Sequence, residues 1–328
     1  MYINKIAQRN VGVGGLSLPL PCFFPSISCV KTNLSCTEYL RLLVALKYPL
    51  FLISAYDIYY ANSNEVNEIK KLLKTAINNK QIVLIDSGNY ESFWLQNKQW
   101  NSKKFEAVLR IVPHQLAFCY DYVARTGKIK KIVTNIEKLV SKNQLASKGT
   151  IIPIVHASKD LLPDIISELV DRVNPLFIAV PERLLGEGIM ARAKTIIKIR
   201  KTLAPKKQYY PLHLLGTGNP LSILIYSICG ADSFDGLEWC QTTVDYNTGL
   251  LYHFQQREFF NLPRNLRTIL TFPYNQATLV YNLQFYKTWV HKIQECISRN
   301  VIKEPIYKYI PYRFKKLLNQ QLKHFIQK

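Results

Sequence analysis

Short apolar segments alternate with helical segments from about residue 20 to residue 240, and this alternation constrains the fold more than any other feature. Between the apolar segments, apolar residues recur three and four positions apart, which is the spacing of helices that pack on one face. Strands that are apolar on both faces are typical of a parallel sheet covered by helices. The segments predicted as strands are 22–27, 50–56, 82–85, 116–120, 150–155, 176–180, 212–215 and 233–237.

Eight strand–helix units in about 220 residues match the count and length of a closed (β/α)8 TIM barrel, which is the α/β fold that we predict. An open, doubly wound sheet is the alternative. It requires phosphate-binding glycines after its first strand, and residues 22–29 contain none. We expect a barrel domain over residues 1–253, with an irregular first twenty residues, and a helical, basic extension packed on it over residues 254–328.

The charge of the chain is strongly positive. Its 328 residues include 43 Lys and Arg against 22 Asp and Glu, a formal net charge of +21. Such an excess favours a polyanionic partner, with nucleic acid first and an anionic membrane surface second. A basic protein without any such partner has the same composition, so charge alone does not decide.

The cysteines and the apolar runs indicate where the protein works. Seven Cys residues are scattered through the chain without a C-x-C or C-x-x-C pair, which favours free thiols in a reducing compartment and no zinc knuckle. The first residues lack the apolar core of a signal peptide, and no apolar run is long enough to span a membrane. We therefore expect a cytoplasmic protein with no membrane partner.

Polar residues stand at the ends of the predicted strands, one strand after another. In a (β/α)8 barrel the active site lies at the carboxyl ends of the strands, so these residues are expected to meet at one mouth. Each also has an ordinary explanation, such as a turn, an ion pair or a packed core side chain. Taken together they favour an active site based on carboxylates. They are Asp86, Asp121, His156, Glu182, Gly216, Gly218 and Asp235.

Two carboxylates that face each other suit substitution at an anomeric carbon, where one attacks and the other transfers protons. Asp235 is the candidate nucleophile, although an Asp in a short apolar strand is more often a turn former or a helix cap. Asp121 is able to accept hydrogen bonds from a purine-like edge. Tyr90 is able to stack on a flat heterocycle, and it is equally explained as a rim residue without a ligand.

Several motifs occur in the order and spacing of the tRNA-guanine transglycosylase superfamily, which the chain resembles over about residues 20–250. Members of that superfamily exchange guanine in a polynucleotide for a 7-deazaguanine base. The motifs are Cys22–Ser28 with Pro25, Asp86-Ser87-Gly88-Asn89-Tyr90, Phe118-Cys119-Tyr120-Asp121, Ile154-Val155-His156-Ala157, Leu215-Gly216-Thr217-Gly218-Asn219-Pro220 and Ser233-Phe234-Asp235.

The resemblance implies a role for each matched residue. Asp235 would attack C1′ of the nucleoside, Asp86 would be the general acid and base, Asp121 would read the purine edge and Tyr90 would stack on the base. The resemblance also implies that further matched residues line the base-binding site, namely Ser87, Gly88, His156, Gly216 and Gly218.

The chain departs from the tRNA-directed enzymes at several motifs. It lacks their C-x-C-x-x-C zinc motif, so neither structural zinc nor another cofactor is expected. Glu238-Trp239-Cys240-Gln241 replaces the Pro-Thr-Arg-Asn segment that helps to hold tRNA, and His156 stands where a Gln is expected. In these respects the chain resembles the DNA-modifying (DpdA-type) branch, which installs 7-cyano-7-deazaguanine in bacterial and phage DNA.

Three basic runs are expected to bind DNA phosphates and to make that binding dependent on salt. Residues 125–148, 192–207 and 301–328 each carry seven Lys or Arg and at most one acid. At least one of the runs is expected to be only a solvated helix face. The predicted contacts are Lys130, Lys131, Arg192, Lys198, Arg200, Lys201, Arg313, Lys315 and Lys316.

The leading prediction is a DNA-guanine transglycosylase that works through a covalent Asp-glycosyl intermediate. A tRNA-guanine transglycosylase would perform the same chemistry on another polymer. A non-catalytic nucleic-acid-binding paralogue would be expected to lack the nucleophile, whereas Asp235 and Asp86 are both present. A plain glycoside hydrolase is the weakest alternative. In duplex DNA the target guanine must leave the stack, and the chain has no P-loop, so ATP-dependent partners that open DNA are expected.

Overall fold

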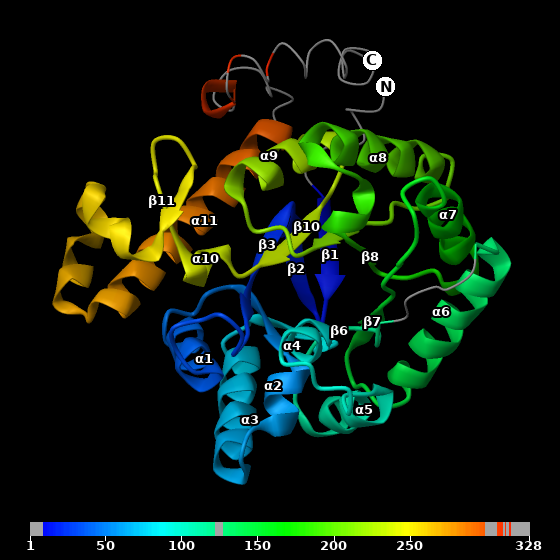
Figure 1. Cartoon of the computed structure of the whole chain (residues 1–328), viewed down its shortest axis with the longest axis horizontal. Helices are drawn as coiled ribbons and strands as arrows, with labels where there is room; N and C mark the ends of the chain where they lie inside the picture. Colours follow the sequence, from blue (N-terminus) through cyan, green and yellow to red (C-terminus); the bar gives the residue numbers. More distant parts are fainter. Residues whose placement is uncertain (1–8, 122–126, 299–306, 311, 313–314, 316–328) are drawn as a thin grey trace.

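Eight parallel strands form a nearly closed sheet in the computed structural model, which describes residues 9–121, 127–298, 307–310, 312 and 315 (Figure 1). Each strand lies beside the strands before and after it in the chain, and the last pairs with the first. The predicted α/β class is confirmed, and the arrangement is consistent with a (β/α)8 barrel. The strands are β3 (Cys22–Ile27), β4 (Leu50–Ser54), β5 (Ile82–Asp86), β6 (Leu116–Phe118), β7 (Thr150–Ile152), β8 (Ile178–Pro181), β9 (Leu212–Leu215) and β10 (Ser233–Gly236).

The sheet is interrupted between β7 and β8, where only a short bridge joins the two strands. The Val155 N–H donates to the Ala179 carbonyl at 2.8 Å, and the Ala179 N–H donates to the Pro153 carbonyl at 2.9 Å. β7 ends at Ile152, earlier than predicted, because Pro153 has no N–H for a regular ladder. β4 is also shorter than predicted, since helix α2 begins directly after Ser54.

Helices follow the strands and cover the outside of the sheet (Figure 1). Several of them begin at side chains that satisfy the first N–H groups of the helix. Ser35 and Asn62 each form a capping box with the Glu three residues later. The helices up to β10 are α1 (Cys36–Ala45), α2 (Ala55–Tyr60), α3 (Ser63–Asn78), α4 (Asn89–Trp94), α5 (Ser102–Ile111), α6 (Ile129–Gln144), α7 (Leu162–Val173), the 3-10 helix η2 (Glu182–Leu185), α8 (Gly188–Leu203) and α9 (Pro220–Cys229).

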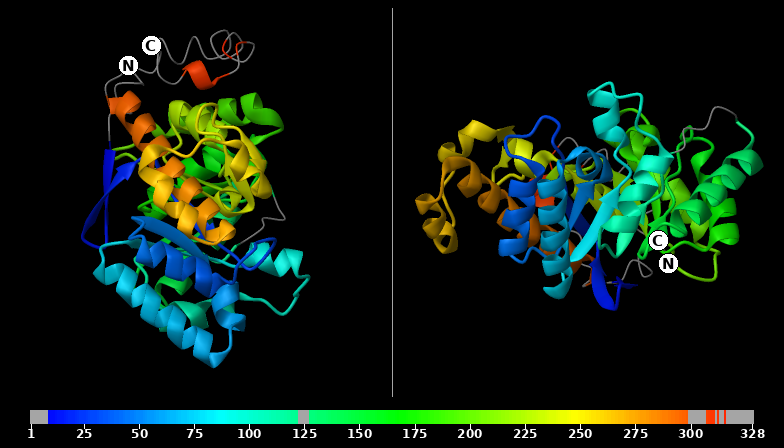
Figure 2. Two further views of the ribbon diagram at one scale, coloured as in Figure 1. Left: turned by 90° about the vertical axis from the view of Figure 1, so that its left-hand side faces the viewer. Right: turned by 90° about the horizontal axis from the view of Figure 1, so that it is seen from below.

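The prediction that the first twenty residues are irregular is wrong for the described part of that segment. Strands β1 (Arg9–Val13) and β2 (Leu16–Leu20) form an antiparallel hairpin. Its two-residue turn is Gly14-Gly15, with φ values of 55° and 80° that suit glycine and the right-handed twist of a hairpin. Figure 2 shows the hairpin and α4 at opposite ends of the sheet. The hairpin therefore covers the amino-terminal end and leaves the carboxyl end of the strands to other segments.

The chain after β10 packs back onto the barrel as far as it is described. Tyr286 stacks on Phe23 with ring centroids 4.4 Å apart, and Trp289 donates to the Pro220 carbonyl at 2.9 Å. Helix α11 (Tyr274–Ser298) thus lies against β3 and α9, while residues 299–306, 311, 313, 314 and 316–328 of the predicted extension lie outside the described residues. The elements are α10 (Glu238–Gln241), the hairpin β11 (Thr242–Val244) and β12 (Leu251–His253), the 3-10 helices η3 (Phe254–Phe259), η4 (Arg264–Thr271) and η5 (Tyr307–Tyr309), and α11 (Tyr274–Ser298).

The helices of the described chain are all unsuited to crossing a lipid bilayer. None of them combines the length with the apolar composition that a transmembrane span requires.

Candidate active site

Asp235 lies buried in β10, and its carboxylate receives three hydrogen bonds. Ser26 of β3 donates to Oδ2 at 3.0 Å. His213 of β9 and the backbone N–H of Gly216 donate to Oδ1 at 3.0 Å and 3.1 Å. These donors come from the two strands beside β10 and from the loop that follows β9. Together they stabilise a negative charge on a side chain that is largely removed from water.

His213 is a polar residue of the site that the sequence did not single out. Its Nδ1 lies 2.8 Å from the Ser233 hydroxyl, and its Nε2 faces Asp235. A carboxylate only accepts hydrogen bonds, so Nε2 carries the proton, and a neutral ring then accepts the Ser233 proton at Nδ1. Ser233 stands opposite His213 in the β9–β10 register, so the imidazole ring contacts Ser233 through Nδ1 and Asp235 through Nε2. In the sequence, the indication of a site residue here was a His inside an otherwise apolar strand.

Glu238 lies over two glycines beside Asp235. Its Oε1 accepts a hydrogen bond from the Gly218 N–H at 3.2 Å. A Cβ on Gly218 would stand 2.0 Å from Glu238 Oε2, and a Cβ on Gly236 would stand 2.3 Å from the same atom. The carboxylate therefore requires glycine at both positions. Burial raises the pKa of Glu238 to about 7, and the nearby charge of Asp235 adds to this.

Asp86 ends β5 and has the opposite surroundings to Asp235. Among the described residues, the Gly88 N–H is the one donor to its carboxyl, at 2.8 Å to Oδ2. The pKa of Asp86 lies well above its usual value, because the protein removes the carboxyl from water and because the charges of Glu91, Asp121 and Asp235 add to the effect. These effects favour the protonated acid more than in an exposed aspartate.

The turn after Asp86 is shaped by Ser87 and Gly88. Gly88 has a φ of 79°, and a Cβ there would stand 2.7 Å from the backbone nitrogen and the Cβ of Tyr56. The Ser87 side chain is buried, and its carbonyl accepts a hydrogen bond from the Trp100 indole at 2.9 Å. Both residues set the path of the backbone past Asp86, and no ligand is needed to explain them.

Glu91 is a buried acid that the sequence did not single out. It lies in α4 and accepts hydrogen bonds from Ser28 at 2.5 Å and from Ser54 at 2.7 Å. Burial and the nearby Asp57 raise the pKa of Glu91 to about 7. β3 thus contributes Ser26 to Asp235 and Ser28 to Glu91. An acid in a short, otherwise mostly apolar helix directly after Asp86 was the only signal in the sequence.

Asp121 and His156 face each other at the ends of β6 and β7. His156 Nε2 lies 3.3 Å from Asp121 Oδ1. Both atoms are buried, and neither makes a well-formed hydrogen bond within the described part of the chain. Buried polar atoms are rarely left without partners, so this pair is suited to receive a polar ligand. The resemblance had assigned both residues to base binding.

Tyr90 stands at the start of α4 with its ring partly exposed. It meets Trp94 edge to face, with ring centroids 6.3 Å apart. Burial and the charges of Glu91 and Glu238 raise the pKa of its phenol. Tyr90 therefore lies within electrostatic reach of both carboxyl groups.

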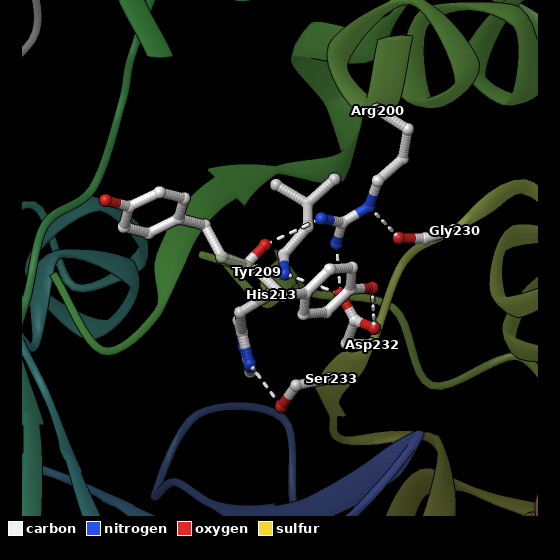
Figure 3. Close-up of polar contacts among 8 residues, drawn as sticks. Arg200, Tyr209, His213, Gly230, Asp232 and Ser233 are labelled. Carbon is white, nitrogen blue, oxygen red and sulfur yellow. Dashed lines mark hydrogen bonds and ion pairs between the residues drawn. The ribbon is translucent and has the colours of Figure 1, made fainter. Parts of the chain in front are cut away.

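Two of the predicted phosphate contacts are occupied within the protein. The Arg200 guanidinium binds the Asp232 carboxylate and the carbonyls of Gly230 and Tyr210, and its side chain is only 13% exposed (Figure 3). Arg192 binds the Glu182 carboxylate at 2.7 Å and is partly buried. We therefore correct the prediction for Arg200, because an interior ion pair leaves it unable to reach a phosphate.

The other predicted contacts are distributed over several elements. Lys130 and Lys131 of α6 are exposed, as are Lys198 and Lys201 of α8. Lys315 is partly buried, whereas Arg313 and Lys316 lie outside the described residues. Each of α6 and α8 thus has an exposed cationic face, which agrees with an electrostatic surface and also with ordinary solvated helices.

No metal site is apparent among the described residues, where no three His, Cys, Asp or Glu side chains converge as ligands. The cysteine motif of the tRNA-directed enzymes is also missing from the sequence, so the residues present do not fit a structural zinc.

Comparisons with known proteins do not identify the family. No protein-family model matches the chain, and no curated protein is similar enough to count as a relative.

Proposed function

We propose that the chain is a DNA-guanine transglycosylase, which exchanges guanine in DNA for a 7-deazaguanine, with 7-cyano-7-deazaguanine as the expected incoming base. One observation carries the proposal. Asp235 is surrounded by three donors that favour the anion, while Asp86 has surroundings that favour the protonated acid. A nucleophile and a general acid at one mouth require this division.

The first half of the reaction uses both groups. A carboxylate oxygen of Asp235 attacks C1′, the bond from C1′ to guanine N9 breaks, and its electron pair leaves with the base. Asp86 gives its proton to the departing guanine. Oδ2 is the oxygen suited to attack, because it accepts one hydrogen bond, from Ser26, whereas Oδ1 accepts two.

The second half reverses these roles. The incoming 7-deazaguanine gives its N9 proton to the Asp86 carboxylate, and N9 attacks C1′ of the glycosyl ester. The ester C–O bond breaks and Asp235 is released as the carboxylate. Asp121 and His156 would bind the polar edge of each base in turn, and Tyr90 would stack on its face.

DNA is the proposed polymer because the segment after Asp235 differs from that of the tRNA-directed enzymes. Glu238 begins that segment, and its buried carboxyl group accepts a hydrogen bond from the Gly218 N–H, whereas the tRNA-directed enzymes have there an arginine-containing segment that helps to hold tRNA. Exposed lysines such as Lys130 and Lys198 supply the charge for a polyanion. The same charge would also serve tRNA or a non-catalytic nucleic-acid-binding role, so the polymer and the chemistry must both be tested.

The test incubates the protein with DNA or with tRNA, each labelled in guanine, together with a 7-deazaguanine. A single-stranded form and a duplex form of the DNA are both used, since a duplex requires opening. Release of label from DNA that depends on the added base is the expected result. Release from tRNA alone would overturn the choice of polymer, and no release from any polymer would overturn the enzymatic proposal.

A further inference from the structure

An aromatic surface stands at the same end of the barrel as the candidate active site. Helices α2 and α4 directly follow β4 and β5, so both lie at the carboxyl end of the sheet, and they pack against each other. Their exposed aromatic side chains form what we call the aromatic rim, which consists of Tyr59, Tyr60, Tyr90, Phe93 and Trp94. Large aromatic side chains that gather outside a core usually mark a binding surface.

Lysines are interleaved with these rings. The Lys31 ammonium lies 3.2 Å from the centre of the Trp94 ring, and that of Lys104 lies 5.3 Å from the ring centres of both Tyr59 and Tyr60. Lys31 belongs to the loop after β3, so loops from three successive strands meet at the rim.

The exposed charge of the rim is of one sign. The acids within residues 55–60 and 89–104 are Asp57 and Glu91, and both are buried. Lys98 and Lys103 are exposed in the same segments. The rim therefore presents aromatic faces and cations to the solvent and no exposed carboxylate from these segments.

We propose that the aromatic rim binds single-stranded or locally opened nucleic acid, whose bases stack on Phe93 and Trp94 while the lysines face the phosphates. This combination of aromatic faces and cations is how proteins hold single strands without reading their sequence. An intact duplex keeps its base faces inside the stack and cannot use such a surface. The proposal deepens the proposed function, on which it rests, by defining the acceptor as an opened strand beside the flipped guanine.

Intrinsic fluorescence gives a direct measurement of this contact. Trp94 is 47% exposed, whereas the other three tryptophans, Trp100, Trp239 and Trp289, are at most 5% exposed. A base stacked on Trp94 is expected to quench the fluorescence of that residue. Adding a single-stranded DNA oligonucleotide should therefore quench the wild type and leave Trp94→Phe unquenched, although that variant still binds the strand through its phenyl ring.

A matched pair of alanine variants separates stacking from general loss of apolar surface. Phe93 is 72% exposed in the rim and Phe259 is 76% exposed in η3. Stacking is worth about 1–3 kcal/mol per base, so Phe93→Ala should weaken binding of the oligonucleotide by about 5- to 150-fold in fluorescence anisotropy. Phe259→Ala should bind as the wild type does. Equal effects of the two variants would overturn the proposal.

Two further measurements test whether an opened strand, rather than a duplex or a membrane, binds to the aromatic rim. Binding is repeated with a duplex of the same sequence and with vesicles that contain phosphatidylserine. Tighter binding to the intact duplex, or binding to the vesicles that depends on Phe93, would overturn the assignment to an opened strand.

Results that refute strand binding by the aromatic rim differ from results that refute the proposed base exchange. Base exchange by the wild type that Phe93→Ala leaves unchanged would refute the rim and keep the proposed function. Strand binding that depends on Phe93, with no base exchange under any condition, would keep the rim and refute the proposed function.

Discussion

The β10 side and the β5 side of the barrel mouth hold carboxyl groups in opposite environments. Asp235 receives hydrogen bonds from Ser26, His213 and the Gly216 N–H. Asp86 receives one from the part of the chain that the structure describes, from Gly88, and it is desolvated beside other acids. Carboxyl groups at one mouth therefore differ in their tendency to hold a proton, because the number of donors and the nearby charges differ over short distances.

Removal of the β10 carboxylate is expected to have the largest effect. Asp235→Ala should lower kcat/KM for base exchange by about 10⁴-fold or more, because it removes the carboxylate that is proposed to form the glycosyl ester. The variant should also fail to form the covalent complex with DNA that the wild type forms when the incoming base is withheld. Normal exchange by this variant would refute the distinction between the two sides.

Removal of the acidic proton on the β5 side is expected to have the next largest effect. Asp86→Asn should lower kcat/KM by about 10²- to 10⁴-fold, which is the usual contribution of a general acid. In the wild type the rate should fall as pH rises through the raised pKa of Asp86, since the deprotonated carboxyl cannot protonate the leaving base. A pH profile measured for both proteins tests this, and an unchanged alkaline limb in Asp86→Asn would exclude Asp86 as the acid.

Two serines of β3 allow the comparison to be sharpened within one strand. Ser26 donates to Asp235 and Ser28 donates to Glu91. Ser26→Ala removes a hydrogen bond to a charged group, worth about 1.5–3 kcal/mol, so kcat/KM should fall by about 10- to 150-fold. Ser28→Ala is the matched control and should have a smaller effect on kcat/KM. If the two variants lower kcat/KM equally, the hydrogen bond to Asp235 has no special role in the reaction.

The stability of the protein should depend on the pH through Glu91. The folded state raises the pKa of Glu91 from 4.5 to about 7, so the fold is stabilised below about pH 4.5 relative to alkaline pH, and this contribution is lost as pH rises through 7. Glu91→Gln should therefore reduce the loss of stability between pH 5 and pH 8, measured by urea denaturation. Glu258→Gln, at an exposed position, is the control. If the free energy of unfolding changes equally with pH in the wild type and in Glu91→Gln, Glu91 is not the source of the pH dependence.

Much of the fold follows from local patterns in the chain. β6 and β8 are short and apolar on both faces, and the spacing of apolar residues in α3 predicts its buried side, because periodicity depends only on the residues of one segment. The hairpin of β1 and β2 was missed, since Gly14, Gly15 and Pro19 obscure its alternation. Its strands form because they pack against the end of the barrel.

The matched motifs placed Asp86 and Asp235 at strand ends, and the structure has both at the carboxyl ends of the sheet. The hydrogen bonds and charges around each of these carboxyl groups are known only from the residues that surround it in the structure. His213 comes from another strand and Ser26 from a residue 209 positions away, so no local pattern relates either of them to Asp235. Likewise Arg200 has the sequence signature of a basic surface helix, and only the position of Asp232 beside it reveals an interior ion pair.

The sequence alone determines three properties of this protein. They are the alternation of strands and helices, the excess of positive charge and the carboxylates at strand ends. They follow from periodicity and residue type, which need no knowledge of distant contacts. The donors and charges that surround each carboxyl group, and the ion pair that encloses Arg200, depend on contacts over distances of a few ångströms. Those distances arise only when strands far apart in the chain become neighbours in the barrel.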